Sequence, residues 1–189
     1  MLMKHTLMGA AIALALSAGN ALAAVSAGEA AKLGTTLTPF GAEKAGNADG
    51  SIPAWTGGIT QAPAGYKGSG QHHVDPFPED KPLFTITKAN LDQYKDKLSA
   101  GQIALFNAYP ESFQMPVYQS RRSGSAPQWV YDNSIKNATS AKLVEGGNGF
   151  ADAYGGIPFP IPQSGLEALW NHIVRYRGTY ITRRSVEAD

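Results

Sequence analysis

The sequence predicts an α+β fold in which helices pack on an antiparallel sheet, and three observations carry this prediction. Helix-start signals recur along the chain, most clearly where Ser164 precedes Glu167 by three residues and opens an apolar helix over residues 165–177. Short runs of β-branched and aromatic residues occupy residues 112–144. Over residues 35–82, Gly, Pro, Asn and Asp recur with no sustained apolar period, which predicts a long Pro/Gly-rich strap.

The first 23 residues have the features of a secretory signal peptide. A basic Lys4 precedes an apolar run over residues 7–16, and Ala21-Leu22-Ala23 supplies the small residues of a cleavage motif. The apolar run is about half as long as a bilayer-spanning helix requires, so we expect cleavage after Ala23 rather than a retained anchor. The mature chain is then periplasmic, either free or associated with the outer membrane.

Composition excludes several kinds of site and partner. The chain has no cysteine, which rules out disulfides, thiolate metal sites and a lipid-modified cysteine. With 16 basic and 15 acidic residues the net charge is +1, so we expect no nucleic acid as a partner. The 21 Gly and 12 Pro indicate a loop-rich chain.

After the signal peptide, residues 1–23, the sequence suggests a strap over residues 24–86 and a domain over residues 87–189. Ser26 and Glu29 form a capping box for a short helix at the start of the strap. Trp55 stands before a Gly pair and is expected to act as an aromatic anchor, either pinning the strap to the core or docking elsewhere.

The domain opens with a predicted helical corner. Thr87 is expected to cap an α-helix that runs to about Leu98. Ser99 and Gln102 form a capping box for a second helix directly after it, which must end before Pro110.

Strand-like pieces follow the helical corner. They lie at residues 113–118, at Trp129-Val130-Tyr131 and, more weakly, over residues 135–143. Turns at residues 123–125 and 132–133 would join them as antiparallel neighbours.

Helix 165–177 is the element around which we expect the domain to be arranged. Alternating prolines give residues 157–162 an extended, polyproline-like conformation that cannot belong to a central strand. Glu167, Asn171, His172 and Arg175 fall opposite the apolar arc of the helix, so we expect the arc to be covered. The arc comprises Leu166, Leu169, Trp170, Ile173, Val174 and Tyr176.

One strand, predicted over residues 179–186, follows this helix. It offers little sheet for the helix to pack on. We therefore expect the sequence to be the N-terminal piece of a longer protein, and the domain to be incomplete and marginally stable by itself.

The sequence displays no catalytic signature, and we expect no enzyme activity, no metal and no other cofactor. His72, His73 and Asp75 are close in sequence, but adjacent side chains diverge and no second ligand cluster follows, so we interpret them as a surface loop. The glycine-rich run 145–149 lacks the Gly-Lys-Ser/Thr of a phosphate-binding loop. A hydrolase that pairs a serine with His72 or His172 would lack a nucleophile elbow.

Several motifs, in order along the chain, carry a family resemblance. They are DGSIPAWTGG at 49–58, DPF at 75–77, KPLF at 81–84, YP at 109–110, MPVY at 115–118, and GGIPFPIP at 155–162 with WNH at 170–172. Together they resemble the domain of unknown function 1329 family. The resemblance implies an exported Gram-negative protein more than twice this length, often labelled an outer-membrane lipoprotein-sorting protein. It also implies a lipoprotein-carrier-like fold, a curved antiparallel sheet around helices with an apolar concavity.

The leading functional hypothesis is a periplasmic carrier or binding protein for a lipid or lipid-like hydrophobic molecule, acting near the outer membrane. The candidate ligand-binding residues are Trp170, Leu166, Ile173 and Phe159, which would line or plug the concavity. For each of them, plain core packing is the alternative. The rival hypothesis is a non-enzymatic periplasmic adaptor that docks on an outer-membrane or transport protein through the strap.

Overall fold

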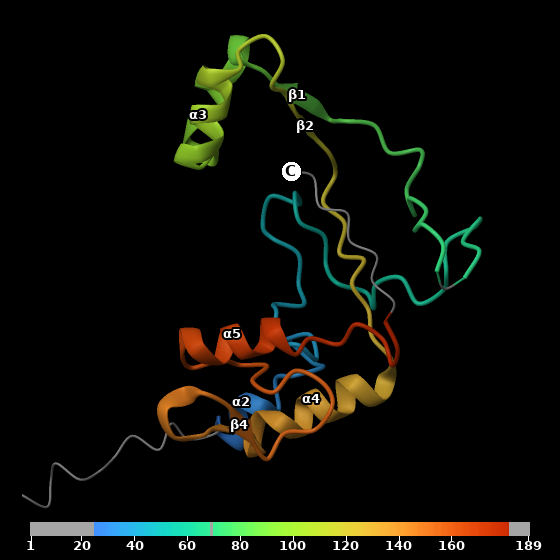
Figure 1. The fold of residues 1–189 in the computed structure, drawn as a ribbon, viewed down its shortest axis with the longest axis vertical. Coiled ribbons are helices and arrows are strands. Elements are labelled where there is room, and N and C mark those ends of the chain that lie inside the picture. Colours follow the sequence, from blue (N-terminus) through green and yellow to red (C-terminus); the bar gives the residue numbers. More distant parts are fainter. Residues whose placement is uncertain (1–24, 69, 182–189) are drawn as a thin grey trace, which may run out of the picture. The chain divides into compact units, whose positions relative to one another are not determined.

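The computed structural model describes residues 25–68 and 70–181, and within them the chain is α+β (Figure 1). Helices alternate with short strands that pair into two separate two-stranded antiparallel sheets. The mixed class predicted from the sequence is therefore confirmed. None of the helices described is long and apolar enough to cross a bilayer. The signal-peptide prediction concerns residues 1–23, which lie outside the described residues.

The chain divides into two compact units, and one of them is discontinuous in sequence. The discontinuous unit combines residues 25–45 with residues 126–181, and the continuous unit spans residues 46–125. The boundary that the sequence suggested after residue 86 falls inside the continuous unit. The first helix among the described residues, α2 (Ala27–Ala30), packs on α4 (Gln128–Ser140), which is why the start of the strap groups with the later part of the chain.

The continuous unit has a small sheet and one α-helix around an apolar core. Its elements are β1 (Phe84–Ile86), the 3-10 helices η1 (Lys88–Gln93) and η2 (Lys95–Lys97), α3 (Ala100–Ala108) and β2 (Met115–Val117). Strands β1 and β2 are antiparallel, with Thr85 opposite Pro116. A proline is tolerated in the centre of β2 because each strand of a two-stranded sheet has a free edge.

Phe106 of α3 is the centre of this core. Its side chain is completely buried and meets the ring of Phe113 edge-on, with ring centroids 4.7 Å apart. Leu91 of η1 and Ile86 of β1 are also buried and complete the cluster. The core therefore joins the helical corner to the sheet.

The capping box predicted for the second helix of the corner is confirmed. The Ser99 hydroxyl accepts a hydrogen bond from the Gln102 N–H at 3.3 Å, and the Gln102 side chain accepts one from the Ser99 N–H at 2.8 Å. Helix α3 ends at Ala108, before Pro110, as expected.

The α-helix predicted from Thr87 to Leu98 is wrong in type. That stretch forms two 3-10 helices with bonds between residues three apart, such as the Tyr94 N–H to the Leu91 carbonyl at 3.0 Å. The Asn90 side chain accepts a hydrogen bond from the Thr87 N–H at 2.7 Å and donates one back to the chain at β1. These hydrogen bonds connect the first turn of η1 to β1. Such local constraints favour short segments of the tighter 3-10 geometry over a continuous α-helix.

Side chains also bind the strap to the segment that follows β2. Trp55 is half-buried, and its indole N–H donates to the Gly124 carbonyl at 3.0 Å, so Trp55 anchors the strap inside this unit. Arg121 donates to Asp80 at 3.0 and 2.5 Å and lies over the ring of Phe77, 4.4 Å from its centroid. The hydrogen bonds to Asp80 raise the pKa of Arg121.

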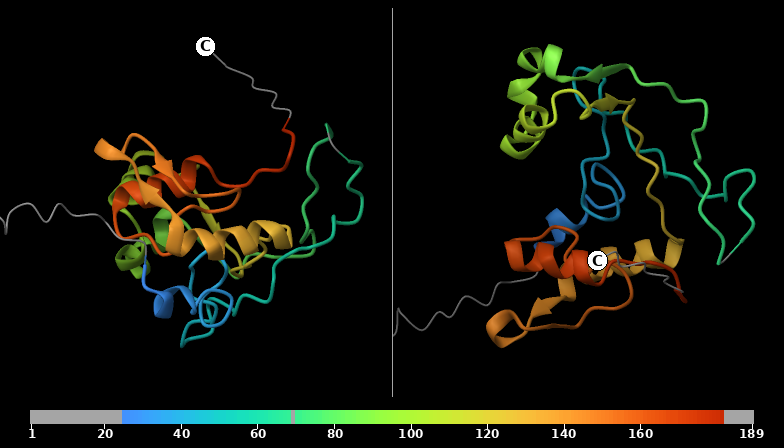
Figure 2. Two further views of the ribbon diagram at one scale, coloured as in Figure 1. Left: turned by 90° about the horizontal axis from the view of Figure 1, so that it is seen from below. Right: turned by 45° about the horizontal axis from the view of Figure 1, so that its top comes forward.

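The discontinuous unit contains the remaining helices and the second sheet (Figure 2). Ser26 and Glu29 form the predicted capping box ahead of the first helix. Strands β3 and β4 form a hairpin around the glycine-rich run, in which Gly146 and Gly147 adopt left-handed conformations. The elements of the unit are α2 (Ala27–Ala30), α4 (Gln128–Ser140), β3 (Lys142–Leu143), the 3-10 turn η3 (Glu145–Gly147), β4 (Phe150–Ala151) and α5 (Gly165–Ile173).

The strands predicted at residues 129–131 and 135–143 are wrong, because residues 128–140 form α4. The only strand in this range is the two-residue β3, and the turns proposed at 123–125 and 132–133 do not join strands. The buried side of α4 includes the polar residues Ser134 and Asn137. These two interrupt the apolar period along the sequence, so the helix does not show a clear hydrophobic pattern.

Small residues allow close packing in this unit. Ala30, Leu33 and Ala138 form a buried cluster where α2 meets α4. Gly41 has a φ of 87°, and a Cβ at this position would lie 1.6 Å from the carbonyl oxygen of Pro160. Only glycine fits there, so the loop after α2 rests directly on residues 154–162, which we call the proline-rich segment.

Candidate functional site

Helix α5 begins where the sequence predicts and ends earlier. The Ser164 hydroxyl accepts a hydrogen bond from the Glu167 N–H at 3.2 Å, which confirms the predicted N-cap. The Glu167 carboxylate accepts from the backbone N–H of Gln163 and not of Ser164, so the reciprocal half of a capping box is shifted by one residue. The helix ends at Ile173 instead of residue 177, and Gly178 lies in the irregular segment beyond it.

The face of α5 that contacts the rest of its unit is polar. Glu167 is only 4% exposed, and Asn171 is half-buried. The Asn171 side chain accepts from the Phe159 N–H at 2.9 Å and donates to the Phe159 carbonyl at 2.6 Å. The expectation that Glu167 and Asn171 lie on the outer side of the helix is wrong. Backbone groups of the proline-rich segment need partners, and these two side chains supply them.

The same segment is bound from its other side by α4. Asn137 donates to the carbonyls of Tyr154 and Ile157 at 2.8 and 3.2 Å, and it accepts from the Tyr154 N–H at 2.9 Å. The Ser134 hydroxyl accepts from the Ile157 N–H at 2.9 Å. The segment therefore lies between α4 and α5, as Figures 1 and 2 show, and side-chain-to-backbone hydrogen bonds hold it to both helices.

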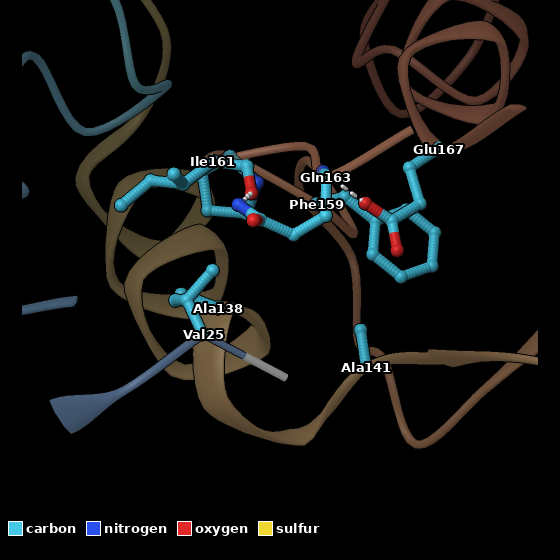
Figure 3. Close-up of a pocket in the computed structure, with 8 residues that line it drawn as sticks. Val25, Ala138, Ala141, Phe159, Ile161, Gln163 and Glu167 are labelled. Carbon is cyan, nitrogen blue, oxygen red and sulfur yellow. Dashed lines mark hydrogen bonds between the residues drawn. The ribbon is translucent and has the colours of Figure 1, made fainter. Parts of the chain in front are cut away.

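A small cavity lies beside the proline-rich segment (Figure 3). Its volume of about 10 Å³ is enough for about one water molecule. Phe159, one of the predicted ligand-binding residues, is buried and lines this cavity, together with Glu167. Ligand pockets usually occupy about 300–1,000 Å³, so Phe159 serves the core here.

Trp170 and Leu166 cover the hairpin formed by β3 and β4. The indole N–H of Trp170 donates to the Gly147 carbonyl at 3.0 Å. The Trp170 ring contacts that of Phe150 edge-on, with ring centroids 5.4 Å apart. Leu166 lies so close to Gly147 that a Cβ there would be 2.1 Å from the leucine Cδ2. The Phe150 ring in turn contacts that of Phe159, with ring centroids 6.1 Å apart. The structure thus brings three of the four predicted site residues together around the hairpin.

The side of α5 turned away from Glu167 is apolar and exposed. Leu169 is 52% exposed, Ile173 48% and Leu166 38%. Their spacing of three and four residues places them along one side of the helix. We call these three residues the α5 stripe. Among the described residues, the predicted cover over the apolar arc is therefore lacking for Leu169 and Ile173 and only partial for Leu166, which contacts the hairpin.

An open groove of about 300 Å³ lies at the C-terminal end of the α5 stripe, within the same unit. Ile173 belongs to both the stripe and the groove. Trp129 of α4 also lines the groove, and its ring contacts that of Tyr176 edge-on, with ring centroids 5.5 Å apart. The groove is lined by Trp129, Gly155, Gly156, Ile173, Val174, Arg175, Tyr176, Arg177, Gly178 and Ile181.

Among the residues that line this groove, Ile173, Val174 and Tyr176 belong to the predicted apolar arc, and only Ile173 is a predicted ligand-binding residue. The sequence predicts a strand at Trp129 and a helix at Tyr176. Neither prediction indicates that the two rings contact each other. A usable signal is the close mixture of apolar and basic residues over 174–177, since all four of these residues line the groove. The strand predicted over residues 179–186 does not begin at 179–181, and its remainder lies outside the described residues.

The histidine pair has a structural contact of its own. The ring of His73 stacks on that of Tyr66, with centroids 5.8 Å apart and planes inclined by 2°. Among residues 25–68 and 70–181, no three His, Cys, Asp or Glu side chains gather in a way that could hold a metal ion.

Comparison with known proteins adds one relative and one family. The chain is 55% identical over 177 residues to a Pseudomonas aeruginosa protein named "Uncharacterized protein PA3922". The alignment covers 94% of this chain and 39% of that protein, so the chain spans about two fifths of the length of the curated relative that it matches. No solved structure matches the chain.

The family assignment comes from the later part of the chain. A family model described as "Protein of unknown function (DUF1329)" matches residues 85–189. The match includes α4, the proline-rich segment and α5, and it agrees with the resemblance found in the sequence motifs. The chain therefore belongs to the DUF1329 family.

Proposed function

We propose that this chain is part of an exported carrier or binding protein for a lipid or lipid-like hydrophobic molecule that works near the outer membrane. The observation that carries the proposal is the orientation of α5, which buries Glu167 and exposes the α5 stripe. A surface helix usually turns its polar side to water. The reverse orientation leaves apolar area in water, where it favours contact with an apolar partner.

The groove extends this apolar surface and gives it a concave end. Its volume is at the lower limit of the range of about 300–1,000 Å³ that is usual for small-molecule sites. Of the four residues predicted from the sequence, Ile173 and Leu166 are exposed enough to contact a ligand directly. Trp170 and Phe159 are less exposed. Trp170 contacts the hairpin, and Phe159 belongs to the proline-rich segment that is bonded to α5.

The finer fold prediction is part of the same proposal. In the longer family protein, the α5 stripe would face the concavity of a curved, lipoprotein-carrier-like sheet. A hydrophobic ligand would then replace part of the contact between helix and sheet. The alternative, a non-enzymatic periplasmic adaptor, would instead dock on a membrane transport protein through the strap.

The proposal is tested by measuring how a long-chain alcohol with a bromine on its alkyl chain quenches tryptophan fluorescence. Trp129 is half exposed on the groove and would be quenched by a nearby bromine. We expect saturable quenching with the wild-type chain. Ile173→Gln should weaken binding about tenfold, because burying an isoleucine side chain contributes about 1.5–3 kcal/mol.

The matched control is Ile52→Gln. Ile52 is 47% exposed, almost the same as Ile173, but it belongs to the continuous unit. Its replacement should leave the affinity unchanged. Absence of saturable quenching, or an equal loss in both variants, would contradict a hydrophobic-ligand site at α5. Purification without detergent that recovers a membrane transport protein and no lipid would favour the adaptor.

Export is a separate prediction. The signal-peptide pattern predicts that the mature chain begins at Ala24, after cleavage behind Ala23. N-terminal sequencing of protein from a periplasmic extract measures this directly. Recovery of a chain that begins at Met1, or recovery only with the inner membrane, would show that the segment is retained.

A further inference from the structure

We infer that the groove beside α5 selects a single-chain amphiphile with an anionic head, and that Arg175 and Arg177 receive the head. This inference rests on the proposed function, because it names the class of ligand for the same site. It depends on a property of the groove that the α5 stripe lacks, namely fixed positive charge. Both arginines line the groove.

Among the residues that the structure describes, the charges on the groove have one sign. No carboxylate is among those lining residues, and the ionisable groups there are Arg175, Arg177 and the phenol of Tyr176. Within the part of the chain that the structure describes, neither arginine forms an ion pair, whereas Arg121 is paired with Asp80. Arginine matches a carboxylate geometrically, because its planar fork of donors can bind both oxygens.

The end of α5 explains why two cations are useful at this place. The C-terminus of a helix carries a partial negative charge of about half a unit, which repels an anion. Arg175 donates to the His172 carbonyl at 2.6 Å and thereby occupies one of the terminal carbonyls of the helix. Two full positive charges exceed the helix-end charge, so the net local field favours an anionic head.

The remaining walls fit an alkyl chain. Trp129 and Tyr176 supply aromatic surface, and Ile173, Val174 and Ile181 supply aliphatic surface. A volume of about 300 Å³ suits one chain better than the two chains of a diacyl lipid. Size, apolar walls and charge together point to a long-chain carboxylate.

The test compares two probes with the same brominated alkyl chain, a carboxylate and an alcohol, both used below the concentration at which they form micelles. Quenching of tryptophan fluorescence in the wild-type chain should show the carboxylate binding about tenfold more tightly than the alcohol, the difference that one charge-assisted hydrogen bond produces. In the Arg175→Gln/Arg177→Gln double variant the preference for the carboxylate should be lost, so that the two probes bind with about equal affinity. Arg175→Lys/Arg177→Lys should restore part of the preference, since it restores the charge.

The control double variant is Lys32→Gln/Lys136→Gln. It removes the same charge from exposed positions of the same unit, away from the groove, and should keep the preference for the carboxylate. Equal binding of both probes to the wild-type chain would overturn the role of the arginines while leaving the proposed function intact. Binding of neither probe would overturn both. Displacement of the alcohol by a polyglutamate peptide would overturn the inference, because it would show that the groove binds an acidic polypeptide and not an amphiphile.

Discussion

Replacing Phe106 with alanine is expected to destabilise the continuous unit by about 3–5 kcal/mol, the usual cost of deleting a fully buried aromatic side chain. Phe106 is completely buried, and its ring is the contact through which α3 meets Phe113, Leu91 and Ile86. Removing the ring leaves a cavity at the centre of the apolar cluster that these elements share. A unit with so small a core has little other apolar contact to offset the loss.

The effect can be measured in this unit alone, because the chain has only three tryptophans. Trp129 and Trp170 belong to the discontinuous unit, so replacing both with phenylalanine leaves Trp55 as a reporter of the continuous unit. Urea unfolding followed through Trp55 should show a clearly lower midpoint for Phe106→Ala. Leu105→Ala is the matched control, since Leu105 is adjacent in α3 and 41% exposed. Equal effects of the two substitutions would show that α3 does not pack as described.

Replacing Asn137 with leucine is expected to destabilise the discontinuous unit by about 2–4 kcal/mol. Leucine has the same branching as asparagine, with bulkier methyl groups in place of the amide, and it favours the helix. It removes the bonds to the Tyr154 N–H and to the carbonyls of Tyr154 and Ile157. A buried backbone group left without a partner costs about 1–3 kcal/mol, and partial access of water reduces the sum here.

Urea unfolding followed by far-UV circular dichroism tests this second effect. Lys136→Leu is the control, because Lys136 is the preceding residue of α4 and is exposed. It should change stability by less than about 0.5 kcal/mol. A gain in stability with Asn137→Leu would mean that the amide only fills space, and that the proline-rich segment is held by its apolar contacts alone.

Local signals in the sequence predicted helix starts well. The side chains of Ser26, Ser99 and Ser164 all cap helices as expected, because a cap depends on residues within one turn. Helix α4 was missed for the opposite reason. Its buried residues Ser134 and Asn137 are polar, and they are buried because a distant segment supplies partners for them, which no local pattern reveals.

The same limit applies to the candidate site. An amphipathic pattern assumes that apolar residues face the protein and polar residues face water. In α5 the backbone of the proline-rich segment reverses this preference, since Glu167 and Asn171 bind groups that water would otherwise have to satisfy. The residues Trp170, Leu166, Ile173 and Phe159 were recognised as one apolar set. Which of these residues lies in the core, on the hairpin or in the groove is decided by tertiary contacts that the local sequence does not show.

The discontinuous unit has a consequence for the order in which the chain folds. Residues 25–45 find their partners only after residue 126, so all of residues 46–125 form a loop between the two halves of that unit. Closing a flexible loop becomes more costly in entropy as its length grows, and contacts distant in sequence slow folding. The continuous unit makes its contacts within that loop and can form first. Once compact, it brings the two halves closer together, so we expect mutations in its core, such as Phe106→Ala, to slow the folding of the discontinuous unit even though they remove none of its contacts.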